Sequence, residues 1–183
     1  LEIAQSGVDK INERKLSKLK EAQTFDGYQI PYDDDSFDLI ILAHVLEHVE
    51  HERILIRELK RVAKNIVIEV PKDYRFGVDK RMKHFLDYGH NNLYTPTSLC
   101  FLLKSEGLEL VADKVSMTKP EVNYFNEFIN KKAKKTISKQ LKIQLEYGIK
   151  HFLGNLLGQN KKEQFANAYT VLTKRSDQNL QIF

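Results

Sequence analysis

Apolar runs alternate with amphipathic runs through the first two thirds of the chain. The run SFDLIILA, residues 36–43, is almost continuously apolar, which is typical of a strand covered on both faces. The following residues place Leu55, Leu59 and Val62 at helical spacing, and NIVIEV then predicts a second buried strand. Two strands that flank a helix form a parallel crossover unit, so the pattern predicts an α/β domain.

Later segments complete the predicted domain. YTPTSLCFLLKSEG predicts a helix that begins after Thr95 as N-cap, has Pro96 in its first turn and ends at Gly107. LELVADKVSM fits a strand, and NAYTVLTKR fits a final one. Near the start, GVDKI is expected to form a short strand that is followed by a helix over residues 12–22.

A helical segment, residues 119–162, precedes the last strand. One face carries an apolar stripe and lysines cover the other. The stripe consists of Leu141, Leu145, Ile149, Phe152 and Leu156. We therefore expect one domain over residues 1–175 with this segment as an insertion, and a loose tail over 176–183.

Composition narrows the class of protein. The 183 residues are 42% hydrophobic, without a run near the roughly 18 apolar residues of a membrane span. LEIAQSGVDK lacks the features of a signal peptide, so a soluble, cytoplasmic protein without stable membrane insertion is expected. The single cysteine, Cys100, excludes an internal disulfide. The net charge of +4 is concentrated near KKAKK and does not by itself indicate a nucleic-acid partner.

His44, Glu47 and His48 follow the predicted strand at the spacing H-x-x-E-H, which one group of zinc peptidases uses. Such a site needs both histidines on one face of a helix together with a third ligand. Because these residues lie at the carboxyl end of a strand, we expect no metal. Histidines that only hydrogen-bond locally are a second interpretation, and a loop that contacts a cofactor is a third.

Four stretches together resemble a known family. They are GVDK, FDGYQIPYDDDSFDLIILAHVLEHV, ILIRELKRVAKNIVIEVP and YGHNNLYTPTSLCFLLKSEGLELV, in order from Gly7 to Val111. They resemble class I S-adenosylmethionine-dependent methyltransferases, especially the small-molecule, type 11-like branch. The resemblance implies a Rossmann-like, mostly parallel sheet with helices on both faces and an antiparallel final strand. It also implies S-adenosylmethionine as cofactor and methyl transfer to a small-molecule acceptor by in-line displacement.

The resemblance also implies a cofactor-binding set near the carboxyl ends of strands. Asp9 resembles the acid that binds both ribose hydroxyls, and Asp26 with the apolar Ile30 resembles the adenine contact. A solvated aspartate and an ordinary Asp-Gly turn are the respective alternatives. The full set is Glu2, Asp9, Asp26, Gly27, Ile30, Ala43 and His44.

His48 and His90 are the candidates for a catalytic base, because histidine exchanges protons near neutral pH; a structural role is the alternative for each. The aromatic and basic connection over residues 72–94 suits an acceptor with a flat part and a negative group, or is only a solvated lid. The helical insertion is expected to cover the acceptor site, although a homodimer contact or a membrane-surface helix fits its stripe as well. A nucleic-acid methyltransferase is supported only by KKAKK.

The chain departs from the family at one point. The family has a glycine-rich loop after its first strand, whereas only Ala4, Gln5 and Ser6 separate LEI from GVD. A break in the chain between Ile3 and Ser6 would leave adjacent Cα atoms beyond roughly 3.8 Å and preserve the enzyme interpretation, with LEI in the middle of the sheet. A continuous chain would instead favour a non-catalytic binding or scaffolding module.

Overall fold

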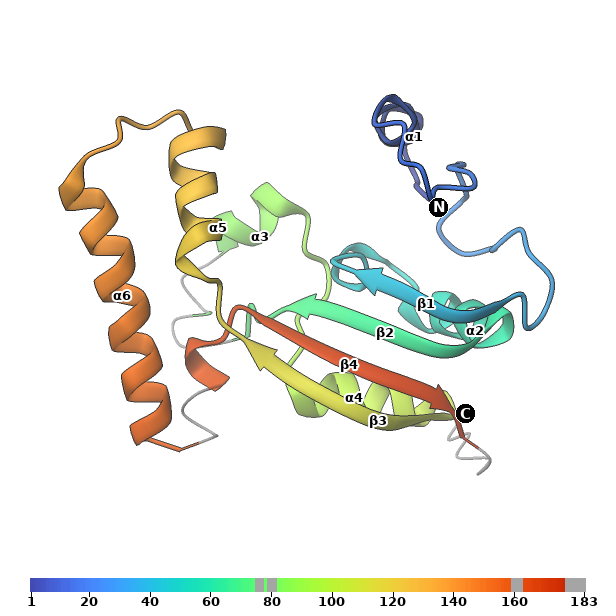
Figure 1. The fold of residues 1–183 in the computed structure, drawn as a ribbon. Helices are drawn as coiled ribbons and strands as arrows, with labels where there is room; N and C mark the ends of the chain where they lie inside the picture. Colours follow the sequence, from blue (N-terminus) through green and yellow to red (C-terminus); the bar gives the residue numbers. More distant parts are fainter. Residues whose placement is uncertain (75–77, 79–81, 159–162, 177–183) are drawn as a thin grey trace.

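A computed structural model describes residues 1–74, 78, 82–158 and 163–176, and its core is a four-stranded sheet (Figure 1). The strands are β1 (Phe37–Ala43), β2 (Ala63–Pro71), β3 (Leu108–Ser116) and β4 (Ala168–Arg175). Their order is β1-β2-β4-β3, with β1 parallel to β2 and with β4 antiparallel to both of its neighbours. The predicted α/β fold class and the antiparallel final strand are confirmed.

The helices after β1 and before β4 include the predicted α2 (Glu52–Val62) and α4 (Pro96–Ser105). Further helical elements of the described residues are α1 (Gln5–Glu13), the 3-10 turn η1 (Leu46–His48), α3 (Met82–Tyr88), α5 (Pro120–Tyr124), the π-helical η3 (Phe125–Asn130) and α6 (Ile137–Leu156). The Thr95 hydroxyl accepts a hydrogen bond from the backbone of Ser98, and Gly107 follows α4 with φ of 79°. The local signals therefore set both ends of α4, as expected.

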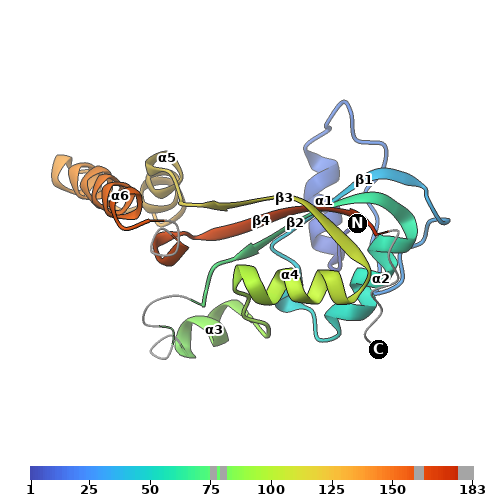
Figure 2. The ribbon, with the colours of Figure 1, turned by 90° about the horizontal axis from the view of Figure 1, so that it is seen from below.

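Helices α2 and α4 cover one face of the sheet and enclose the core (Figures 1 and 2). From the sheet, this core takes alternate residues of each strand, because side chains at i and i+2 point to the same face. Fully buried members include Leu55, Ile56, Val62, Ile66, Ile68, Leu99, Leu103 and Val171. The core thus fixes the register of β1 on β2, where Leu42 lies opposite Ile68.

The opposite face of β1 is open. Leu39 and Ile41 are 48% and 69% exposed, whereas Leu42, on the other face, is buried. The sequence predicts helices on both faces, but in the part of the chain that the structure describes no element covers these two side chains. β1 also forms an edge of the sheet, so its apolar run is more exposed than its composition suggests.

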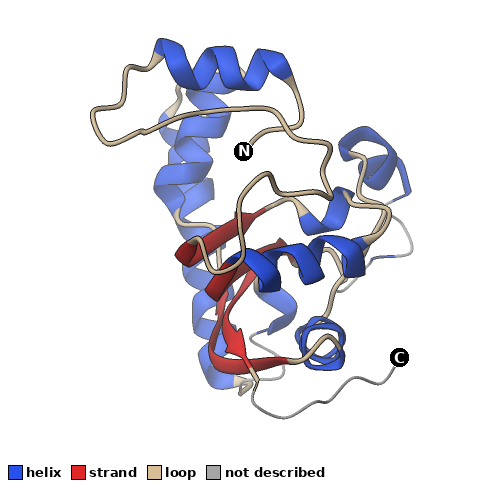
Figure 3. Cartoon of the chain, turned by 90° about the vertical axis from the view of Figure 1, so that its right-hand side faces the viewer, coloured by secondary structure: helices blue, strands red, loops and turns tan. Residues whose placement is uncertain are grey.

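The N-terminal segment differs from the expected one. GVDKI lies within α1 rather than in a strand, and Glu2 forms only an isolated parallel bridge with Thr24. Helix α1 lies apart from the sheet (Figures 1 and 3), so LEI is not in its middle. A strand needs a neighbour for its backbone hydrogen bonds, whereas a helix satisfies them locally. The predicted helix over 12–22 is also wrong, because α1 ends at Glu13.

Residues 3–6 lead directly from the bridge of Glu2 with Thr24 into α1. The amides of Gly7 and Val8 both donate to the carbonyl oxygen of Ala4, at 2.9 and 3.3 Å. Helix α1 therefore begins directly after Ala4, without a glycine-rich loop between Ile3 and Ser6.

The insertion stands beyond one end of the sheet (Figure 1). Helix α6 packs beside α5, and the Tyr124 hydroxyl donates to the carbonyl oxygen of Gln140 at 3.2 Å. The predicted apolar stripe of α6 is exposed; Leu145, for example, is 62% exposed. Among the described residues, none of the helices is both long and apolar enough to cross a bilayer.

Candidate functional site

Side chains capable of acid–base chemistry gather where β1 and β2 end. His44 follows β1 in a left-handed conformation with φ of 54°, and its amide donates to the carbonyl oxygen of Glu69 on β2 at 2.9 Å. Its ring Nε2 lies 3.2 Å from the Glu69 carboxylate. The turn that follows forms η1 and presents Glu47 and His48 at the carboxyl edge of the sheet, where open α/β sheets bind ligands.

A distant segment is tied to this turn by hydrogen bonds. The amides of Asn91 and Asn92 donate to the carbonyl oxygen of Glu47 at 2.8 and 3.0 Å. The Asn92 side chain also donates to the carbonyl oxygens of Leu46 and Val49. These contacts bring the rings of His48 and His90 to a centroid distance of 5.0 Å. The two predicted catalytic histidines therefore lie side by side.

His90 belongs to a second group of polar side chains. Its Nδ1 is hydrogen-bonded to Asp73, whose other carboxylate oxygen lies 3.4 Å from Nε2 of His84. Asp73 is 5% exposed, so this carboxylate is largely withdrawn from water. Neither the burial of Glu47 nor the part played by Asp73 was predicted from the sequence. Asp73 stands just past the end of the predicted second strand, so the strand-end rule could have found it.

The predicted cofactor-binding acids of the N-terminal segment are engaged locally. Asp9 lies on the exposed side of α1 and accepts from the Gln5 side chain at 2.9 Å. The Glu2 carboxylate accepts from the amides of Ile3 and Ala4 at 2.8 and 3.3 Å. A Cβ added at Gly7 would lie 2.5 Å from Cγ of Glu2, so this side chain fills the space beside the glycine.

Asp26 forms a tight turn. Its carboxylate accepts from the amides of Gln29 and Tyr28 at 2.6 and 2.8 Å, and these two hydrogen bonds lower the pKa of Asp26. Gly27 allows the turn by adopting φ of 90°. The adjacent Ile30 is buried in the core and its amide donates to Glu58. The geometry is therefore that of an Asp-Gly turn, although its carboxylate still faces solvent.

The predicted cofactor-binding residues do not gather in one place in the described chain. Only Ala43 and His44 lie at a strand end, whereas Asp9 lies on a helix apart from the sheet. The space that a glycine-rich loop would leave open is filled by Glu2 at Gly7. Of this set, the described chain therefore keeps only Ala43 and His44 at the edge of the sheet where open α/β sheets bind ligands.

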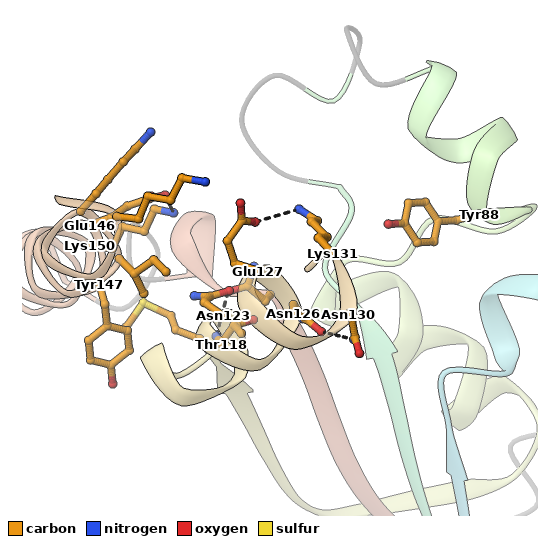
Figure 4. Close-up of a pocket in the computed structure, with 15 residues that line it drawn as sticks. Tyr88, Thr118, Asn123, Asn126, Glu127, Asn130, Lys131, Glu146, Tyr147 and Lys150 are labelled. Atoms are coloured by element: carbon orange, nitrogen blue, oxygen red, sulfur yellow. Dashed lines mark hydrogen bonds and ion pairs between the residues drawn. The ribbon is translucent and has the colours of Figure 1, made fainter. Parts of the chain in front are cut away.

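A polar cavity of ≈ 810 Å³ lies between the insertion and Tyr88 (Figure 4). Its lysines include Lys131 and Lys150, which pair with Glu127 and Glu146 at 3.2 and 2.6 Å. Two further lysines, Lys139 and Lys142, line the same cavity. The ring centroid of Tyr88 is 5.9 Å from that of His90, so the cavity adjoins the pair formed by His48 and His90.

Part of the predicted lid over residues 72–94 can also be located. Lys83, His84, Phe85 and Tyr88 belong to α3, and Tyr74 is exposed after β2. Arg75, Phe76, Lys80 and Arg81 lie outside the described residues. Of this segment, Tyr88 reaches the cavity and His84 reaches Asp73.

Known proteins share this fold. The chain aligns with a SAM-dependent methyltransferase of Methanosarcina mazei with a TM-score of 0.57 and 13% identity, over 96% of this chain and 80% of that one. Phosphoethanolamine N-methyltransferase 2 of Haemonchus contortus, solved with S-adenosyl-L-methionine, gives a TM-score of 0.55 and 11% identity, over 92% of this chain and 40% of that one. The [4+2]-cyclase SpnF aligns with a TM-score of 0.56 and 15% identity, over 95% of this chain and 64% of the cyclase. The chain therefore spans less than two thirds of the cyclase.

The curated proteins gave no match to the sequence. The family model described as a methyltransferase domain matches residues 5–113, which is more than half of the chain and includes β1, β2 and the turn with His44, Glu47 and His48. The chain therefore belongs to the methyltransferase domain family, whose cofactor is S-adenosylmethionine.

Proposed function

We propose that the chain acts in methyl transfer from S-adenosylmethionine to a small-molecule acceptor that carries a negatively charged group. The cavity beside Tyr88 is the observation that carries this proposal. Since its two glutamates already pair with Lys131 and Lys150, the charges of Lys139 and Lys142 are in excess. A polar cavity with excess positive charge favours a small anionic ligand.

The adjoining histidines supply a proton acceptor for this function. Nδ1 of His48 lies 2.9 Å from the carbonyl oxygen of Gly89, which can only accept, so Nδ1 carries the proton and Nε2 has the lone pair. His90 is held in the same way by Asp73. Either Nε2 could take the proton of an acceptor that loses one on methylation.

Binding and turnover test this function separately. Calorimetry with the demethylated cofactor should show binding, and an assay with labelled S-adenosylmethionine against small anionic metabolites should then identify an acceptor. In the double variant Lys139→Glu with Lys142→Glu, we expect the acceptor KM to rise about tenfold or more with cofactor affinity unchanged. The double variant Lys104→Glu with Lys18→Glu is the matched control, because both lysines are exposed and neither lines the cavity.

Two results would contradict the proposal. Absence of cofactor binding at millimolar ligand would remove the enzyme interpretation. An equal rise of KM in the control variant would show that overall charge, and not the cavity, controls acceptor binding.

A non-catalytic binding module is the second candidate. It is favoured by the start of α1 directly after Ala4, which leaves no glycine-rich loop. A similar structure is that of a [4+2]-cyclase, and one fold commonly serves several functions. Binding of an anionic metabolite that depends on Lys139 and Lys142, without any cofactor binding, would support the module.

A further inference from the structure

Three side chains that can bind metals converge at the carboxyl edge of the sheet. Glu47 and His48 come from the turn after β1, and His90 comes from the segment after α3. One ligand atom from each lies within 4.8 Å of the other two. Bonds of about 2.0–2.1 Å in a tetrahedral zinc site place ligand atoms about 3.3 Å apart.

Glu47 is the second, independent observation. This residue is 1% exposed, and neither carboxylate oxygen has a hydrogen-bond partner among the described residues. Two ring nitrogens lie close to its Oε1, Nδ1 of His44 at 3.4 Å and Nε2 of His48 at 3.8 Å. Because an ionised carboxylate is strongly disfavoured without water, hydrogen bonds or a cation, a bound cation would compensate its burial.

Both histidines are oriented as metal ligands usually are. His48 donates through Nδ1 to the carbonyl oxygen of Gly89, and His90 is hydrogen-bonded through Nδ1 to Asp73. These outer contacts fix the ring orientation and leave the Nε2 lone pair of each histidine available. Gly89 adopts φ of 67° after α3, which turns the chain so that His90 faces the η1 turn.

We propose that Glu47, His48 and His90 bind a divalent transition metal of the zinc type. Two imidazoles and one carboxylate suit Zn²⁺ better than Mg²⁺ or Ca²⁺, which prefer oxygen ligands alone. Three protein ligands leave a fourth position, and the exposed side of His48 gives it access to solvent. With the ion bound, both histidines serve as ligands rather than as proton acceptors. The site shares His48 and His90 with the proposed methyl transfer, but the inference does not rest on that function, because zinc binding is measured without cofactor or acceptor.

This ligand set differs from the one that the H-x-x-E-H spacing suggests. The peptidase arrangement would use His44 with His48 on one helix, but His44 precedes η1 and its Nε2 lies against Glu69. The position of the motif after a strand therefore does not place His44 and His48 on one helix. The expectation of no metal is what this inference replaces, because His90 supplies the second imidazole from a distant segment.

Zinc titration of the chelator-treated full chain against a chromophoric competitor tests the site. We expect one ion per chain. Glu47→Gln, which keeps the side-chain shape, and His90→Ala should each lower the affinity by at least about 100-fold, and Asp73→Asn should lower it by about 10- to 100-fold. His151→Ala, on the exposed surface of α6, is the control and should bind zinc like the parent chain.

His44→Ala decides between the two ligand sets. Retained binding in this variant together with loss in His90→Ala supports the proposed site, whereas the reverse result overturns it. Absence of stoichiometric zinc binding by the parent chain, or equal loss in His151→Ala, also overturns it. A circular-dichroism melt of the metal-free Glu47→Gln variant shows whether its loss of binding occurs in a folded chain, and retained zinc binding by that folded variant would refute the role of Glu47.

Discussion

Nε of Arg57 donates a hydrogen bond of 2.7 Å to the carboxylate of Glu106, which joins α2 to the end of α4. Arg53 also donates to this carboxylate, and the Lys60 ammonium donates to the Glu106 carbonyl oxygen at 2.7 Å. Glu106 is 4% exposed, so it is the buried member of a group whose arginines still reach solvent. This group holds together the two helices that cover the sheet.

Glu106→Ala should lower the free energy of unfolding by about 2–3 kcal/mol. The estimate corresponds to the loss of charge-assisted hydrogen bonds, and it is moderate because the arginines left behind can turn to water. Urea denaturation measures the change. Glu50→Ala, an exposed residue before α2, should stay within about 0.5 kcal/mol of the parent. A similar loss in both variants would contradict the structural role of Glu106.

The same carboxylate should make stability depend on acid pH. Burial raises the pKa of Glu106, but the hydrogen bonds from Arg57 and Arg53 outweigh it and the net pKa is lowered. A lowered folded-state pKa stabilises the fold above the unfolded value of about 4.3, and this stability is lost as pH falls through the folded pKa. The melting temperature, measured from pH 7 to pH 3, should therefore begin to decrease once the pH is below about 4. The decrease should be less steep in Glu106→Gln. An equal decrease of melting temperature with pH in the parent and in Glu106→Gln would argue against a contribution of Glu106 to the pH dependence.

The open face of the sheet predicts an asymmetric response to charge. Ile41→Lys should change the free energy of unfolding by less than about 0.5 kcal/mol and reduce self-association, because Ile41 is 69% exposed. Leu42→Lys, one residue later and buried, should prevent stable folding. Sedimentation velocity and denaturation measure the two effects. Strong destabilisation by Ile41→Lys would show that this face is covered in solution.

The capping box of α4 offers a local test. Thr95 and Ser98 exchange hydrogen bonds between side chain and backbone at 2.9 and 3.0 Å. Thr95→Ala should cost about 1 kcal/mol of stability, because an amide of the first turn loses its acceptor. Thr97→Ala, exposed within the same turn, is the control and should have a small effect. Chemical denaturation measures the free energy of unfolding of both variants. An equal loss in the two would show that the cap does not stabilise the helix.

Several elements could be predicted because their signals are local. Thr95, Pro96 and Gly107 specify the ends of α4 through backbone geometry alone. The apolar periodicity likewise predicts α2, β1 and β2, and the family resemblance predicts the antiparallel β4. The same pattern was misleading for GVDKI, because whether five residues form a strand depends on a partner strand that local sequence does not specify.

The candidate site, too, could be predicted from the sequence only in part. The sequence by itself determined the α/β class, the capped helix and the placement of His44, Glu47 and His48 just after a strand, since these follow from periodicity and propensity over short stretches. Only the tertiary structure decided that His90 and Asp73 join them, through the hydrogen bonds of Asn91 and Asn92 to the η1 turn. Such pairings between distant segments arise from packing and burial of the whole chain, which no single stretch encodes.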